Sequence, residues 1–264
     1  MTEVIGLAVA ISIGFSLGMI GGGGSILTVP VLVYLLHINP ILATAYSLFV
    51  VGLTSLIGAV SFMRKGLVDY RTAVVFALPS LLAVFLTRQF VVPAIPEEVF
   101  AWDAFILTKN MAVMLLFALV MLAAAFSMIR SGKEDQEADQ PIQYNYPLIV
   151  LEGLVVGILT GLVGAGGGFL IIPALVLLAH LPMKMAVGTS LLIIAAKSLI
   201  GFLGDISRQA IDWPFLLLFS GFAIGGILLG SFFSRYVSAG KLKGGFGWFL
   251  LLMGTYILTK ELFI

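Results

Sequence analysis

Residues 21–30 read Gly21-Gly22-Gly23-Gly24-Ser25-Ile26-Leu27-Thr28-Val29-Pro30 and interrupt an apolar run near the start of the 264-residue chain. A related stretch in the second half of the chain reads Gly164-Ala165-Gly166-Gly167-Gly168-Phe169-Leu170-Ile171-Ile172-Pro173. A single small residue pair would be typical of close helix packing, but four or five consecutive small residues favour a break in the helix. Each stretch therefore predicts a helix that stops and restarts.

The amino-acid composition indicates that this chain folds in a membrane rather than in water. Hydrophobic residues make up 61% of it and charged residues 10%, whereas a soluble domain is about half apolar and about a quarter charged. The chain cannot bury that much apolar surface within itself, which excludes a water-soluble monomer. A β-barrel would alternate apolar and polar residues. The apolar runs here do not alternate, so they predict a polytopic helical membrane protein.

Ten apolar runs follow one another along the chain, at 4–20, 25–36, 41–63, 72–93, 104–129, 147–163, 169–181, 183–204, 213–234 and 244–263. Six of them have at least 20 residues and can cross a hydrocarbon core of about 30 Å: 41–63, 72–93, 104–129, 183–204, 213–234 and 244–263. The runs 25–36 and 169–181 are too short to cross it. Each of these follows a glycine stretch, which predicts two re-entrant hairpins.

The chain repeats itself at a constant offset, at which Gly21 corresponds to Gly164 and Pro30 to Pro173. Over 14–70 against 157–213, nineteen of 57 pairs are identical without a gap. The informative identities are polar residues, prolines and glycines, and they include His37/His180, Ser47/Ser190, Ser55/Ser198 and Asp69/Asp212. The hydrophilic stretch 131–146 separates the copies. We expect a first repeat at 1–130, a linker at 131–146 and a second repeat at 147–264.

The placement of Lys and Arg predicts the orientation of the repeats. With the 64–71 loop in the cytoplasm, nine of the 14 basic residues lie inside and four lie outside, Arg88 among the four. Each repeat then has three full crossings, so the two copies have opposite orientation and both termini are extracytoplasmic. The fold class is an all-α polytopic membrane protein with two inverted repeats, each a glycine-broken re-entrant hairpin plus three transmembrane helices. Such repeats are typical of secondary transporters.

The glycine breaks are the first candidate site. A helix that begins inside the membrane presents backbone N–H groups and a positive dipole end, and glycine lets an anion approach them. The candidate anion-binding residues at the breaks are Gly23, Gly24, Ser25, Gly166, Gly167 and Gly168. The alternative interpretation is that these glycines only allow close helix packing.

Lys197 is the sharpest single candidate, because it lies about fourteen residues into the 183–204 run and its repeat counterpart is Thr54. A lysine at that depth needs an anionic partner, either the substrate or a structural carboxylate such as Glu152. Hydroxyl groups could add donors to the anion or serve helix packing: Tyr46, Ser47, Ser55, Thr189, Ser190 and Ser198. The candidate proton-coupling groups are His37, His180 and Glu152, although both histidines are also typical helix C-terminal caps. Asp69 and Asp212 are expected to cap helices at their N-termini.

The two glycine stretches resemble the doubled signature of the TauE/SafE sulfite exporter family, and Ala186-Val187-Gly188-Thr189-Ser190-Leu191 is similar to that family as well. The first half reads Ala45-Tyr46 at the positions where the second has Gly188-Thr189. The resemblance covers nearly the whole chain. It implies a permease of the cell membrane for a small sulfur-containing or organic anion, such as sulfite, a sulfonate or a related carboxylate.

Other function classes are less well supported. The chain has no Cys and two His, and it contains no HExxH, GxSxG or GxxxxGK[ST] motif, so we expect neither an enzyme nor an ATP-driven pump, and no metal site or cofactor. A net charge of +1 does not favour a nucleic-acid partner. The expected partners are a small anion and membrane lipid. A passive anion channel, proton coupling and the oligomeric state are left open.

Overall fold

The computed structural model describes the chain apart from residues 1, 21–23, 103–104, 131–145, 165–166, 178–180, 207–208, 234–235, 237–238 and 264. Its elements are predominantly helices, in the order α1 Thr2–Ile20, α2 Gly24–Pro30, the π-helical segment η1 Val31–Leu35, α3 Pro40–Arg64, α4 Tyr70–Leu86, the π-helical segment η2 Thr87–Val91, α5 Val92–Ala94, β1 Glu98–Trp102, β2 Phe105–Thr108, α6 Lys109–Arg130, α7 Tyr146–Val163, α8 Gly168–Leu177, α9 Met183–Ile206, α10 Trp213–Phe233 and α11 Ala239–Phe263.

Six stretches of helix among the described residues are long and apolar enough to cross a membrane: Pro40–Arg64, Tyr70–Ala94, Lys109–Phe126, Tyr146–Val163, Lys184–Ile206 and Trp213–Phe233. Their outward faces carry large exposed apolar side chains, such as Leu78, Leu82 and Phe126. Such faces suit lipid rather than water. The molecule is therefore a multi-pass helical membrane protein, as the composition predicted.

Three details of the spans differ from the sequence prediction. The run 104–129 does not start as a helix, because residues 105–108 pair antiparallel with Glu98–Trp102 in a small hairpin and α6 begins at Lys109. Strand-forming Phe and Ile at the start of that run explain the difference. The 18-residue helix α7, shorter than the 20-residue threshold used above, also satisfies the criteria for a span. Helix α11, which contains the predicted crossing 244–263, is not among the six stretches found in the described residues.

Arg88 also departs from the sequence prediction, which counted it among the basic residues on the extracytoplasmic side. The helical stretch Tyr70–Ala94 continues through it, and its side chain is fully buried. It pairs with Asp205 of α9 and so does not report on the charge of a loop. Without Arg88, nine basic residues lie on the predicted cytoplasmic side and three on the other side. This distribution still favours the predicted orientation.

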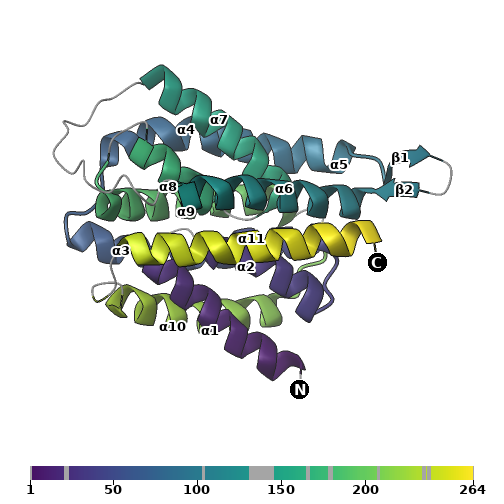
Figure 1. Cartoon of the computed structure of the whole chain (residues 1–264), viewed down its shortest axis with the longest axis horizontal. Coiled ribbons are helices and arrows are strands. Elements are labelled where there is room, and N and C mark those ends of the chain that lie inside the picture. The colour runs from purple at the N-terminus through teal and green to yellow at the C-terminus, as the bar shows by residue number, and fades with distance from the viewer. Residues whose placement is uncertain are drawn as a thin grey trace.

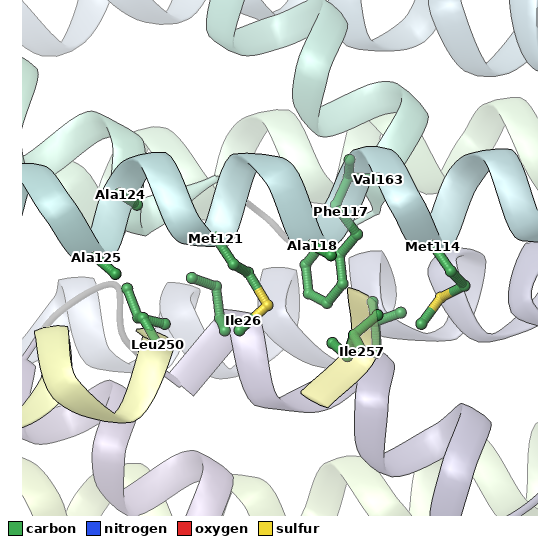
Figure 2. Close-up of a cluster of buried hydrophobic side chains, with 11 residues drawn as sticks. Ile26, Met114, Phe117, Ala118, Met121, Ala124, Ala125, Val163, Leu250 and Ile257 are labelled. Carbon is green, nitrogen blue, oxygen red and sulfur yellow. The ribbon is translucent and has the colours of Figure 1, made fainter. Parts of the chain in front are cut away.

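The core between α6 and α11 follows from helical periodicity. Met114, Phe117, Ala118 and Met121 recur at spacings of three and four residues and form one face of α6. Figure 2 shows this face directed at Leu250 and the other apolar side chains of the cluster. The cluster also includes Ile26 of α2 and Val163 of α7, the residues that flank the two glycine breaks. Both broken helices are thus anchored in one apolar core.

Glycines pack the helices in pairs, α1 on α10 and α7 on α4. Gly14 lies against the carbonyl of Ala223, and Gly157 lies against the carbonyl of Ser80, so neither position has room for a side chain. At the repeat offset Gly14 corresponds to Gly157, and Ser80 corresponds to Ala223. The two contacts are therefore equivalent, with the first and second copies exchanged. The same relation holds for Gly58 against Leu191 and Ile227 and for Gly201 against Leu48 and Val84.

Two hydrogen bonds between the halves follow the same offset. The backbone N–H of Asp212 donates to the Tyr46 hydroxyl at 2.8 Å, and that of Asp69 donates to the Thr189 hydroxyl at 2.9 Å. Asp69 and Asp212 also cap α4 and α10, since their carboxylates accept from Arg71 N and Phe215 N. The predicted capping roles are confirmed.

Figure 1 shows at which end of the molecule the helices begin and end. The start of α1, the end of α11 and the β1–β2 hairpin lie at one end of the molecule, and the α3–α4 connection lies at the other. Helix α7 starts at the end opposite to the start of α1. Helices α2 and α8 are in contact with each other.

Candidate functional site

The second glycine break has a backbone that only glycine adopts readily. Helix α7 ends at Val163, and Gly164 and Gly167 have φ angles of 71° and 67°. The N–H of Gly164 closes the last turn of α7 on the Thr160 carbonyl at 2.7 Å, and those of Leu170 and Ile171 bond to the Gly167 carbonyl in the first turn of α8. The chain therefore ends one helix and starts the next within five residues. The start of α8 carries the positive end of a helix dipole.

Lys197 reaches this break from α9. Its side chain is fully buried, and its Nζ donates to the Thr160 Oγ1 at 3.0 Å. A Cβ added at Gly167 would lie 2.5 Å from that Nζ, so the ammonium group touches the glycine backbone. No carboxylate oxygen of the described residues lies within 4 Å of the Nζ. The structural salt bridge to Glu152 that the sequence left open is thus not formed.

Arg88 approaches the same break from η2. Its guanidinium is fully buried, with Nε donating to Asp205 Oδ2 at 2.7 Å and Nη2 donating to Thr44 Oγ1 at 2.9 Å. Within the described part of the chain, its Nη1 has no hydrogen-bond partner. An orphaned guanidinium nitrogen in an apolar interior is costly unless an acceptor reaches it.

Thr44 connects the arginine to the glycine break, because its backbone and Cβ press against Gly164 and leave no room for a side chain there. Gly167, where Lys197 lies, comes three residues after Gly164, so at most about 10–11 Å of chain joins the two contacts. Two buried cations therefore reach the break, Lys197 directly and Arg88 through Thr44. Among the described residues, one of them has a carboxylate partner and the other does not.

The hydroxyl residues singled out from the sequence fall into two groups. Those of Ser47, Ser55 and Ser198 are buried and, among the described residues, have no hydrogen-bond partner. Those of Tyr46 and Thr189 accept from the loops before α10 and α4, as described above. Ser190 belongs with the second group, since its Oγ donates to the Val187 carbonyl at 2.8 Å. The first group keeps the capacity to donate to a ligand.

The remaining predicted residues are placed as follows. Gly167 and Gly168 are buried at the second break. Gly24 and Ser25 open α2, and their surroundings are not among those the structure describes. Gly23, Gly166 and His180 lie outside the described residues. His37 is exposed just beyond η1 with a φ of 54°, and Glu152 is half-buried on α7.

Four residues of the site were missed by sequence reasoning: Thr44, Arg88, Thr160 and Asp205. The signal that could have found the two charged ones is the one that singled out Lys197. At the repeat offset, Arg88 corresponds to Ser231 and Asp205 to Phe62, so each is a charge that the other copy lacks. Arg88 also lies well inside the apolar run 72–93.

These features define a multi-pass membrane protein with buried cations at a broken helix, and comparison with known proteins gives the family. The family model described as Sulfite exporter TauE/SafE matches residues 6–257. The chain is 31% identical over 256 residues to a probable membrane transporter protein of Xylella fastidiosa (strain 9a5c), covering 94% of this chain and 92% of the relative. It is 27% identical to the probable membrane transporter protein YunE of Bacillus subtilis (strain 168), over the full length of both.

A third relative, the probable membrane transporter protein MJ0441 of Methanocaldococcus jannaschii, is 28% identical over 212 residues, covering 77% of this chain and 73% of the relative. No solved structure matches the chain. The chain belongs to the TauE/SafE sulfite exporter family. It is a membrane transporter by family, as the resemblance of its glycine stretches predicted.

Proposed function

We propose that this protein is a secondary transporter that moves a small sulfur-containing anion, such as sulfite or a sulfonate, across the cell membrane by alternating access. The observation that carries the proposal is the ammonium group of Lys197, which lies against the backbone of Gly167 with no carboxylate beside it among the described residues. A buried charge without a counterion is destabilising, and an anion bound at the start of α8 would neutralise it.

The anion would be held by groups from both halves of the chain. Lys197 and the first N–H groups of α8 contact it from the second half, and the orphaned Nη1 of Arg88 contacts it from the first. Oxyanions of sulfur present several acceptor oxygens, which suits a set of N–H and O–H donors. The buried hydroxyls of Ser55 and Ser198, on the packed pair α3 and α9, are further donors in this proposal.

An inverted repeat favours alternating access over a passive pore, and the paired contacts between the halves support such a repeat. When the halves exchange under a two-fold rotation, a contact between a residue of the first copy and one of the second is accompanied by a contact between their two counterparts. The pairs Tyr46–Asp212 and Thr189–Asp69 have this relation. In such folds the two repeats rock against each other around a fixed central site. The opposite ends from which α1 and α7 enter agree with this arrangement.

A counterflow experiment tests the transport mode. Purified protein in proteoliposomes preloaded with unlabelled sulfite should accumulate external radiolabelled sulfite transiently above its equilibrium level. The Lys197→Ala variant should not. Repeating the experiment with vesicles preloaded with methanesulfonate or a short carboxylate would show which class of anion the protein exchanges for sulfite. Simple equilibration without an overshoot would mean a passive channel, and no uptake of any of these anions would overturn the proposal.

We also propose that both termini are extracytoplasmic. The chain has no native Cys, so single Cys can be placed at Gly66, between α3 and α4, and at Pro96, before the β hairpin. A membrane-impermeant maleimide added to intact cells should label position 96 and spare position 66. The reverse pattern would invert the orientation.

A further inference from the structure

Buried charge in the described residues is concentrated around the second glycine break. Arg88 and Lys197 are fully buried and Asp205 is 2% exposed. The remaining buried cation among the described residues is Lys109, which begins α6 and is 8% exposed. Its Nζ lies 3.9 Å from a carboxylate oxygen of the exposed Glu97, so it belongs to a different ion pair. Among the described residues, two buried positive charges and one buried negative charge therefore lie near the break.

Asp205 neutralises part of the positive charge of Arg88. Its Oδ2 accepts from the Arg88 Nε at 2.7 Å, on the side of the guanidinium away from Nη1. The carboxylate therefore neutralises about half of the positive charge available to a ligand without occupying the Nη1. An anion bound at the break would be attracted by both cations and repelled by the carboxylate of Asp205.

We propose that Asp205 sets the charge of the transported species, so that the site takes singly charged oxyanions in preference to doubly charged ones. This inference rests on the proposed function. The three buried side chains sum to +1, which one monoanion neutralises, whereas a dianion leaves an uncompensated negative charge in a poorly screened interior. For sulfite the preferred form is the singly protonated one, and sulfonates fit the same rule.

The size of the effect follows from Coulomb's law. At an effective dielectric constant of about 20, a unit charge several ångströms away changes the affinity of a second charge by about tenfold or more. Sulfate and methanesulfonate are matched probes, since both carry a tetrahedral sulfur of similar size and differ in net charge. Their affinity ratio isolates the charge preference from any general loss of binding.

The experiment measures both affinities by titration calorimetry on purified protein and three variants, which are compared by the summed charge of positions 88, 197 and 205. Asp205→Asn gives +2, the unchanged protein and the double variant Arg88→Gln/Asp205→Asn give +1, and Lys197→Gln gives 0. We expect the unchanged protein to bind methanesulfonate more tightly than sulfate. Asp205→Asn should shift the ratio toward sulfate by about tenfold or more. The double variant should bind both anions more weakly at an unchanged ratio, and Lys197→Gln should bind neither tightly.

The outcomes separate this inference from the function on which it rests. Binding of both anions with the same ratio in Asp205→Asn and the unchanged protein would overturn the inference and leave the anion site in place. Absence of binding by the unchanged protein would overturn both. Removing one partner of a buried ion pair can prevent folding. If Asp205→Asn does not fold, the double variant Arg88→Gln/Asp205→Asn provides the test. Its summed charge is still +1, so an affinity ratio shifted toward sulfate would contradict the proposal that this charge sets the preference for monoanions.

Discussion

The two glycine breaks have related sequences but lead into helices of different length, and the residues that correspond to the polar contacts of the second break are different in the first copy. The first leads into α2, which has seven residues before it passes into η1, and the second leads into α8, which has ten. At the second break, Thr44, Arg88, Thr160, Lys197 and Asp205 supply the polar contacts. Their counterparts at the repeat offset are Val187, Ser231, Leu17, Thr54 and Phe62.

This difference separates two contributions of the sequence. Identities between the copies, such as Gly14 with Gly157 and Gly58 with Gly201, bring the helices together. Differences between the copies place charge, since none of the five counterparts is charged. We infer that the repeat builds the scaffold and that departures from the repeat build the site, at the second break.

The largest expected effect is that of Gly167→Val. A branched side chain at a φ of 67° would be strained, and its Cβ would collide with the Lys197 ammonium and the Thr160 hydroxyl. We expect loss of sulfite counterflow in proteoliposomes while membrane insertion is retained. Gly221→Val on α10 is the matched control, because a Cβ there meets nothing within 4 Å. Normal transport by Gly167→Val would return the glycines of this break to a packing role.

Lys197→Ala should be next in size. Removing one partner of a desolvated charge pair costs about 2–5 kcal/mol, or roughly 30-fold to several thousand-fold in anion affinity. Lys197→Arg should lose less, since it keeps the charge. The control is Thr54→Ala at the counterpart position, where the hydroxyl bonds within its own helix to Val50 and the affinity should not change. A folded Lys197→Ala protein with unchanged affinity but a lower melting temperature would make Lys197 structural.

Thr44→Val and Thr160→Val should have intermediate effects. Each removes the hydroxyl that accepts from a buried cation, and a hydrogen bond to a charged group contributes about 1.5–3 kcal/mol. Part of that loss falls on the positioning of the cation, so we expect anion affinity to fall roughly tenfold. Valine has nearly the same shape as threonine, and the counterpart of Thr44 in the second copy is Val187. Equal affinities in both variants and the unchanged protein would mean that the threonines do not position the cations.

The smallest expected effects concern Tyr46→Phe and Thr189→Val. Each removes the acceptor for one backbone N–H in the loop before a helix, at corresponding positions in the two halves. We expect each to lower the free energy of unfolding by about 1 kcal/mol and to leave anion affinity unchanged. Melting curves and calorimetry on the same samples measure the two quantities. Unequal losses of stability would weaken the two-fold relation, and a loss of affinity would return these hydroxyls to the site.

Sequence reasoning predicted the class of fold because hydrophobicity and internal repetition are properties of single segments. Length and apolarity identified most of the spans, and the glycine stretches identified the breaks. The β hairpin was missed because its four-residue strand Phe105–Thr108 is as apolar as the helix that follows it. Hydropathy does not separate the two.

The site was predicted in part, for a different physical reason. Lys197 stood out as a charge inside one apolar run. The Arg88–Asp205 pair joins residues that are far apart in the sequence and lie in different halves, and the packing of η2 against α9 decides that contact. Tyr46 and Thr189 have the right chemistry to donate to an anion, but each reaches a loop of the opposite half instead. Such contacts depend on tertiary structure and have no local pattern.

The most direct test of the account locates a bound anion. Selenite carries a heavier atom than sulfite with the same arrangement of oxygens, so its anomalous scattering would mark the site in crystals of protein containing ordinary methionine. We predict one selenium peak at the second break, with oxygens within hydrogen-bond distance of Lys197 Nζ and Arg88 Nη1 and close to the backbone of Gly167. A peak at the first break, or one remote from both cations, would contradict it.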